Sequence, residues 1–519
     1  MIAIGTEQIM NTFSKRGLIG QVTKIALLSL VTALFGYMTY VAFMANEFVI
    51  GSVLLVLTVL INVVYLLPRK APLKFLFPGT VLLVIFVLSP ILYTVVMSGF
   101  VYKTGNEIEK DQALIQILET GLTPDESSTT FDMVLGEYQG KTSALLTNQV
   151  TGEVLLGSNG KAEALADGTY EKNSLGVASE FEGFTALSDD AAAQKEEEIV
   201  KLQFAIEGEQ YVKAEALDVA ALYVQAYELS EGNSVLTDTV NGIVYKDNGQ
   251  GNFVTDTGEY LYPGWRALSP LENYSALILN PVLRGPFLSV FAWTISFSLI
   301  TVITMFAAGL ALAIALDKKI RFRNFYRSIL ILPYAIPSFM SILIWNGMFN
   351  REFGAINQLI GMQVDWYNDP FLAKLVILIV NLWLGFPYFY LIATGALQAL
   401  PSDIEEAAQL DGARGSQIFR LIKLPLLLQI LSPLLIASFA FNFNNFNIVY
   451  LLTAGGPTDV LAGETAGATD ILITYAYKTA FGSAEQNLGL ASAISVIMFV
   501  IVGLLSMWSL RRSKVLEEI

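Results

Sequence analysis

The sequence predicts an all-α polytopic membrane protein of eight transmembrane helices with an inserted β-rich extracytoplasmic domain. Of the 519 residues, 54% are hydrophobic and 15% are charged. Several uncharged runs reach about 20 residues, which is the length that a helix needs to cross a bilayer. Residues 101–275 contain 30 acidic and 10 basic residues, a net charge of −20, whereas the remainder carries +5. An acidic, water-soluble insert therefore interrupts a mildly basic membrane part.

Eight apolar runs define the expected spans. They fall at residues 24–45, 48–67, 75–98, 286–316, 328–349, 371–400, 425–453 and 488–510. Basic residues cluster in alternate loops: Lys15, Arg16 and Lys24; Arg69, Lys70 and Lys74; Lys318, Lys319, Arg321, Arg323 and Arg327; Arg414, Arg420 and Lys423; Arg511, Arg512 and Lys514. Because cytoplasmic loops are rich in Lys and Arg, both termini are expected in the cytoplasm.

This reading divides the chain into three parts. Residues 1–98 form three N-terminal helices, 99–275 a soluble domain outside the membrane, and 276–519 a core of five helices. Within the soluble part, "NGIVYKDNGQGNFVTD" predicts a β-hairpin with its turn at Asp247–Gly251. A surface this acidic has no reason to bind nucleic acid. It serves either as a docking face or simply as a solvated one.

Several kinds of chemistry are excluded. The chain has no cysteine and no histidine, so disulfides, imidazole catalysis and His/Cys metal sites are ruled out. Gly140-Lys141-Thr142 looks like the end of a phosphate-binding loop, but the required first glycine would be residue 135, which is Leu135. The sequence therefore predicts no nucleotide site in this chain.

Prolines interrupt the later spans. Pro333 and Pro337 lie in the fifth run, Pro387 in the sixth, close to Gly385, and Pro433 in the seventh. Broken helices are tolerated in membranes where they line a cavity or pack against protein. The C-terminal half is therefore expected to be the working core, and the first three spans peripheral.

The loop at residues 401–424 reads as two short helices that project into the cytoplasm. Ser402 and Glu405 have the spacing of a capping box, and Gly412 suits a left-handed helix end. A second helix is expected from Ser416 to Leu424, stopping at Pro425. Two apolar surfaces are expected, one of Ala407, Ala408 and Leu410 and one of Phe419 and Ile422. They indicate a partner-binding loop rather than a polar connector.

Four asparagines stand in the seventh run, "SFAFNFNNFNIVY": Asn442, Asn444, Asn445 and Asn447. An unpaired amide in hydrocarbon costs a few kcal/mol. On one helix, Ser438, Phe441 with Asn442, and Asn445 would share a face. These amides could bond other helices. Alternatively they could bind a sugar, since an amide offers a donor and an acceptor to hydroxyls and aromatic rings offer flat apolar faces.

At the cytoplasmic loop a family resemblance becomes visible. "EAAQLDGARGSQIFRLIKLPL" resembles the EAA motif of ABC-importer permeases. The segments "LILPYAIPSFMSILIWNGMFN", "NLWLGFPY", "SFAFNFNNF" and "LLTAGGP", together with a large insert after the third span, resemble the larger permease subunit of maltose/maltodextrin importers. The resemblance covers nearly the whole chain.

The resemblance implies a type I ABC importer permease in the bacterial inner membrane, with residues 99–275 in the periplasm. It implies a substrate site made of Asn381, Leu384, Gly385, Tyr388, Ser438, Phe441, Asn442 and Asn445. It implies an ATPase-coupling site made of Glu406, Ala407, Ala408, Gly412, Ile422, Leu424 and Pro425. The implied partners are a smaller permease subunit, a homodimeric cytoplasmic ATPase that binds ATP and magnesium, a periplasmic maltose-binding protein, maltose or maltodextrin, and membrane lipids. The chain itself would catalyse nothing and hold no cofactor or metal.

Two other classes stay open at this stage. A secondary transporter driven by an ion gradient would favour ionisable residues inside the membrane, of which the core has few. A membrane-bound sensor could use the acidic domain to detect a ligand. Neither class accounts for the spacing of the cytoplasmic loop.

Overall fold

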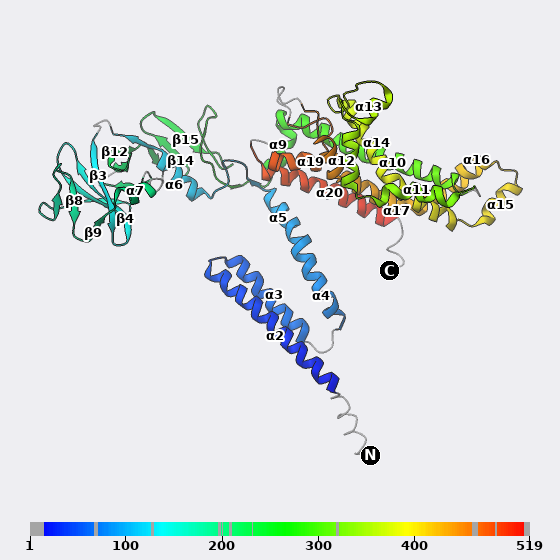
Figure 1. The fold of residues 1–519 in the computed structure, drawn as a ribbon, viewed down its shortest axis with the longest axis horizontal. Helices are drawn as coiled ribbons and strands as arrows, with labels where there is room; N and C mark the ends of the chain where they lie inside the picture. Colours follow the sequence, from blue (N-terminus) through cyan, green and yellow to red (C-terminus); the bar gives the residue numbers. More distant parts are fainter. Residues whose placement is uncertain are drawn as a thin grey trace, which may run out of the picture. The chain divides into compact units, whose positions relative to one another are not determined.

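The computed structural model describes residues 15–66, 71–125, 129–195, 199, 201–206, 210–230, 232–317, 321–458, 465–482 and 485–512. The chain forms two compact units, Met1–Tyr93 and Thr94–Ile519, shown as a ribbon in Figure 1. Five of the basic residues that set the expected orientation lie outside the described residues: Arg69, Lys70, Lys318, Lys319 and Lys514.

The first unit consists of long apolar helices. They are α2 (Lys15–Met44), α3 (Phe48–Leu66), α4 (Ala71–Leu83), the π-helical turn η1 (Val84–Leu88) and α5 (Ser89–Met97), whose end belongs to the second unit. The Asn62 amide donates to Thr32 Oγ1 on α2 at 2.9 Å. A Cβ at Gly51 would lie 2.7 Å from the Phe43 ring. The small residue and the polar pair therefore hold α2 and α3 closely together.

The membrane class is confirmed. Within the described residues, seven helices are long and apolar enough to cross a membrane, or eight if one bent pair counts as a span. The bent pair is α11 (Arg323–Ala335) and α12 (Ser338–Met348), whose axes meet at 93°. The fifth run is thus broken between Pro333 and Ser338, as its prolines predict.

Of the remaining helices of the second unit, the first two belong to the insert and the others to the part of the chain that follows it. They are α6 (Lys110–Thr120), α7 (Asp189–Gln194), α9 (Glu272–Leu279), α10 (Pro281–Ala315), α13 (Ala355–Ile360), α14 (Pro370–Ala399), α15 (Ser402–Leu410), α16 (Gly415–Ile418), η2 (Phe419–Lys423), α17 (Leu424–Phe443), α18 (Phe446–Thr453), α19 (Leu472–Tyr477), η3 (Lys478–Gly482) and α20 (Leu488–Arg512). The close contact of α10 with α14 depends on Gly309, where a Cβ would lie 2.6 Å from the Tyr390 backbone nitrogen.

Two expected breaks do not occur. α14 runs through Pro387 and α17 runs through Pro433 without ending. A proline removes one backbone hydrogen bond, and in a membrane helix neighbouring groups can compensate for it. The seventh run breaks later, between α17 and α18, where Asn444 and Asn445 leave the helical conformation.

The insert is built mainly from strands, as predicted. One sheet has the order β2-β12-β11-β10-β6-β5-β4-β3-β9, and a further pairing of β12 with β3 closes it into a barrel. Its strands are β2 (Leu122–Pro124), β3 (Thr130–Tyr138), β4 (Lys141–Asn148), β5 (Val154–Ser158), β6 (Lys161–Ala164), β9 (Phe184–Ala186), β10 (Gln203–Ala205), β11 (Gln210–Ala214) and β12 (Val219–Gln225). Thr142 lies inside β4 rather than at a helix N-terminus, which supports the rejection of a phosphate-binding loop.

A second sheet follows the barrel along the chain. Its order is β13 (Tyr227–Leu229), β14 (Val235–Asp238), β15 (Ile243–Asp247), β16 (Phe253–Val254) and β17 (Tyr260–Leu261), and a separate pair is β7 (Tyr170–Lys172) with β8 (Ala178–Phe181). The predicted hairpin is confirmed, since β15 pairs with β16 and Asp247 lies opposite Phe253. Gly249 and Gly251 supply the positive φ values of its turn.

The insert joins the core through a short strand pair, β1 (Phe100–Val101) with β18 (Ala267–Leu268). The buried Asn273 amide of α9 donates to the backbone oxygens of Ser98 and Phe100 at 2.9 and 2.8 Å. The Thr104 backbone N–H donates to the Gln486 oxygen at 2.8 Å. The chain around β1 is thus hydrogen-bonded to α9, which leads into α10, and to the segment that leads into α20.

Candidate functional site

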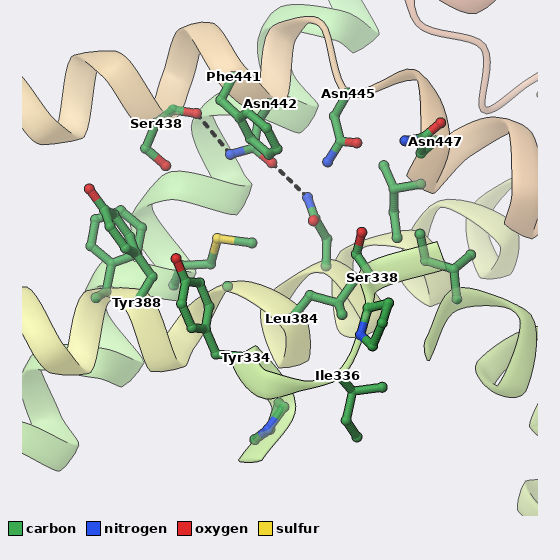
Figure 2. A pocket seen from close by; sticks show the side chains of 18 of the residues that line it. Tyr334, Ile336, Ser338, Leu384, Tyr388, Ser438, Phe441, Asn442, Asn445 and Asn447 are labelled. Carbon is green, nitrogen blue, oxygen red and sulfur yellow. Dashed lines mark hydrogen bonds between the residues drawn. The ribbon is translucent and has the colours of Figure 1, made fainter. Parts of the chain in front are cut away.

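A cavity of about 720 Å³ opens among three walls of the core (Figure 2). The first wall is α14, the second is the end of α17 with the start of α18, and the third is the break between α11 and α12. The lining residues are Met305, Pro333, Tyr334, Ala335, Ile336, Pro337, Ser338, Ile342, Asn381, Leu384, Gly385, Tyr388, Phe389, Ala437, Ser438, Phe441, Asn442, Asn445, Asn447 and Ile448. Its volume lies in the usual range for small-molecule sites.

All eight residues expected at the substrate site line this cavity: Asn381, Leu384, Gly385, Tyr388, Ser438, Phe441, Asn442 and Asn445. The expected common helix face is wrong for Asn445, because α17 ends at Phe443 and Asn445 precedes α18. The bend of the chain, rather than helical periodicity, turns Asn445 towards the cavity.

Asn442 is engaged within the protein. Its side chain is 2% exposed. Its Oδ1 accepts a hydrogen bond from Asn381 Nδ2 at 2.9 Å, and its Nδ2 donates to the Ser438 backbone oxygen at 2.8 Å (Figure 2). Asn442 therefore ties α17 to α14, which is the helix-bonding role that the sequence left open.

The other asparagines differ from Asn442 and from one another. The Asn444 amide donates to the Ala440 oxygen at 3.2 Å, and Asn444 does not line the cavity. The side chains of Asn445 and Asn447 line the cavity and make no hydrogen bond to any residue in the described part of the chain. Their donors and acceptors are available to a ligand.

Aromatic side chains flank these amides. The Phe441 ring is 70% exposed, and Tyr388 packs edge-on against Phe389 with ring centroids 5.4 Å apart. Gly385 leaves room for Met305, whose thioether would collide with a Cβ at this position. Phe386, which follows Gly385, does not line the cavity.

Sequence reasoning missed the third wall as part of the site, including Tyr334 and Ser338. The signal for it was the spacing of Pro333 and Pro337. Pro337 has no N–H, so the carbonyl of Pro333 loses its helical donor and the backbone opens. Such a break is stable in a membrane only where it faces protein or a cavity.

The lining residues, all of them described by the structure, include no Asp, Glu, Lys or Arg. Amides, hydroxyls and aromatic rings can bind a neutral ligand with many hydroxyl groups. No charged side chain in this lining balances the charge of an ionic ligand.

The cytoplasmic loop has the expected two helices but different local contacts. α15 starts at Ser402 with Pro401 before it, and no side chain caps its N-terminus. The predicted capping box is wrong, because Glu405 instead forms an ion pair with Lys423 at 2.5 Å. Gly412 ends α15 with φ of 83°, as predicted.

The second helix does not stop at Pro425. α16 continues through the π-helical turn η2 into α17, and Pro425 follows η2 closely, after Leu424. The two side chains of the expected ridge, Phe419 and Ile422, are half-buried, and Phe419 packs on the core.

In Figure 1, α15 and α16 lie at the end of the second unit, beyond α14 and α17. Of the expected coupling residues, Glu406, Ala407, Gly412 and Pro425 are exposed, and Ala408, Ile422 and Leu424 are half-buried. Leu410, which was expected on the same surface, is 89% exposed.

The family described as "Binding-protein-dependent transport system inner membrane component" matches residues 302–513. The maltose/maltodextrin transport system permease protein MalF of Vibrio vulnificus is 34% identical over 515 residues, which cover 95% of both chains. MalF of Escherichia coli strain K12 is 32% identical over 521 residues, which cover 95% of this chain and 96% of the relative. Among solved structures, a bacterial ABC transporter that imports the acidic polysaccharide alginate aligns with a TM-score of 0.41 at 18% identity, covering 47% of this chain and 83% of that one.

The chain therefore belongs to the family of binding-protein-dependent ABC-importer permeases that includes the MalF proteins, multi-pass membrane subunits of bacterial importers that are non-catalytic and carry no cofactor of their own.

Proposed function

We propose that this chain forms the translocation path for maltose and maltodextrins and holds the sugar in the cavity between α14, α17 and the broken fifth span. The relatives at 34% and 32% identity are maltose/maltodextrin permeases. The observation that carries the proposal is the lining of the cavity. Residues from two distant segments, which the family resemblance assigns to substrate, lie around one neutral space.

The chemistry of the lining supports a sugar in particular. Asn445 and Asn447 offer unused amides, and the exposed Phe441 ring and Tyr388 offer apolar faces. A pyranose has hydroxyl groups around its edge and C–H groups on its faces, so it can use both kinds of group at once. An ion-coupled transporter is disfavoured, because no acid or base stands in this lining to bind the ion.

The cytoplasmic loop is the proposed contact with the ATPase. Glu406, Ala407 and Leu410 are exposed on α15, and the Glu405–Lys423 ion pair ties α15 to the start of α17. A force applied to α15 therefore reaches α17, which carries Ser438 and Phe441 of the cavity. ATP-driven movement of the ATPase would open the cavity to alternate sides of the membrane.

The proposed assembly has a smaller permease subunit, a homodimeric ATPase that binds ATP and magnesium, and a periplasmic maltose-binding protein. In this arrangement residues 99–275 lie in the periplasm, residues 276–519 form the permease core with the coupling loop at 401–424, and both termini are cytoplasmic. The basic residues of the alternate loops support this orientation.

Two adjacent asparagines provide a matched test. Asn445→Ala removes an amide that lines the cavity and makes no hydrogen bond to the described residues, whereas Asn444→Ala removes one that lies outside the lining. Loss of a partner for a bound hydroxyl costs about 1–3 kcal/mol, or roughly five- to 150-fold in affinity. We expect Asn445→Ala to weaken maltose binding to the purified complex by this factor and Asn444→Ala to leave it unchanged. Equal affinities in the two variants would remove Asn445 from the site.

A further inference from the structure

Four aromatic side chains form a continuous surface next to the cavity. Phe446 and Tyr450 of α18 stack with ring centroids 4.8 Å apart. Tyr477, at the end of α19, lies edge-on to both at 5.1 and 5.4 Å, and Phe481 of η3 follows at 5.4 Å. Tyr450, Tyr477 and Phe481 are 37%, 39% and 60% exposed. These four residues are called the aromatic surface below.

The aromatic surface begins where the cavity ends. Phe446 stands between Asn445 and Asn447, which both line the cavity. Asn447 and Tyr450 are three residues apart on α18 and so share one helix face. Figure 2 shows Asn447 beyond Asn445 along this segment, away from Ser438 and Phe441. The exposed face of α18 thus runs from the free amide of Asn447 to the ring of Tyr450.

The aromatic surface is neutral. Lys478, the charged residue that follows Tyr477, is bound to the buried Asp470 carboxylate at 2.7 Å. The two tyrosines add hydroxyl groups to the ring faces. Rings that stack on flat apolar groups, with hydroxyls at their edges, are suited to the faces and rims of pyranose units.

We propose that the aromatic surface is a second binding site for glucose oligomers, which holds the units of a chain that extend beyond the cavity. The inference rests on the proposed function, since it assumes that the cavity holds one end of the sugar. The cavity has a volume of about 720 Å³, and the units of a longer chain that leave it would pass along an adjoining wall. The wall formed by α18 offers a free amide and then stacked rings. Short sugars that fit inside the cavity do not reach this surface.

The test compares two sugars that differ in length. The complex of this chain with its transport partners is reconstituted in proteoliposomes, and uptake of maltose and of maltoheptaose is measured. The variants are Tyr450→Ala, which removes a ring, and Tyr450→Phe, which keeps it. Tyr260→Ala is the control for loss of a tyrosine exposed elsewhere, since Tyr260 is 55% exposed on the insert.

We expect Tyr450→Ala to lower kcat/KM for maltoheptaose by about two- to tenfold, the loss of one stacked pair. Maltose uptake should stay within about twofold, and Tyr450→Phe and Tyr260→Ala should resemble the unmodified complex. Two results would overturn the inference. One is an equal effect on both sugars. The other is a lower yield of assembled complex with normal uptake per complex, which would make the surface a subunit contact. Uptake by the unmodified complex is measured first. If that complex imports neither sugar, the proposed function itself fails.

Discussion

The hydrogen bond between Asn381 and Asn442 predicts that these amides stabilise the helix bundle. Both side chains are buried, at 3% and 2% exposure, and the donor–acceptor distance is 2.9 Å. Among the described residues, Asn442→Ala leaves the Asn381 amide with one side-chain hydrogen-bond acceptor, Thr301 Oγ1 at 3.5 Å. Double-mutant cycles on hydrogen bonds between membrane helices average about 0.6 kcal/mol and reach about 1.7. Because this pair is excluded from water, we expect a coupling energy in the upper half of that range.

The assay is thermal or denaturant unfolding of the purified complex carrying Asn381→Ala, Asn442→Ala or both. The double variant should be less destabilised than the sum of the single variants, by the coupling energy. Sugar affinity is measured on the same samples. Strictly additive losses would refute the helix tie. So would unchanged stability of Asn442→Ala combined with a large loss of sugar affinity, since the amide would then serve the ligand alone.

Three further predictions concern the loop, the insert and a buried ion pair. Gly412→Pro should uncouple ATP hydrolysis from uptake in an inserted protein, because Pro cannot adopt positive φ or donate a hydrogen bond to the Gln409 oxygen. Gly412→Asn should retain uptake, because Asn tolerates positive φ. Normal uptake by the Pro variant would refute the coupling role. Replacing residues 101–275 by a short linker should leave the spans inserted but reduce uptake, and unchanged uptake and complex yield would show that the domain is dispensable. Lys478→Met should destabilise the complex by about 3–5 kcal/mol, because Asp470 loses its counter-charge. Burial raises the Asp470 pKa, so the loss of stability should be largest at neutral pH and shrink on acidification, when the protonated carboxyl needs no partner. If the difference in melting temperature between Lys478→Met and the unmodified complex did not change with pH, this prediction would be contradicted.

The sequence predicted the membrane class and the β-rich insert because both depend on local composition. Apolar runs of bilayer length mark the spans, and the Asp247–Gly251 turn marks a hairpin, whatever the rest of the chain does. The lining of the cavity was predicted for a different reason, namely the resemblance of "NLWLGFPY" and "SFAFNFNNF" to known permeases. Composition alone could not have brought Tyr388 and Asn445 together.

The wrong expectations share a physical cause, which is that tertiary contacts decide them. Pro387 and Pro433 were expected to break helices, but the helices continue and the break falls at Asn444 and Asn445. Glu405 has the spacing of a capping residue, yet Lys423 lies within reach once the loop folds back. An ion pair between two segments cannot be read from the spacing within one of them.

The roles of the four asparagines also depend on tertiary contacts that the sequence does not show. Their number in an apolar run indicated a purpose, but not which amide serves which purpose. Asn442 meets Asn381 only because α14 lies against α17, and Asn445 faces the cavity only because the helix ends before it. One stretch of similar residues therefore divides into a structural amide and free ones.

The most direct test of the sugar site is a structure of the assembled transporter with maltose, trapped by a nonhydrolysable ATP analogue. The proposed function predicts sugar density in the cavity, against Tyr388 and Phe441 and within hydrogen-bond distance of the Asn445 amide. Maltose bound elsewhere, with this cavity filled by side chains of a partner subunit, would contradict the proposed site.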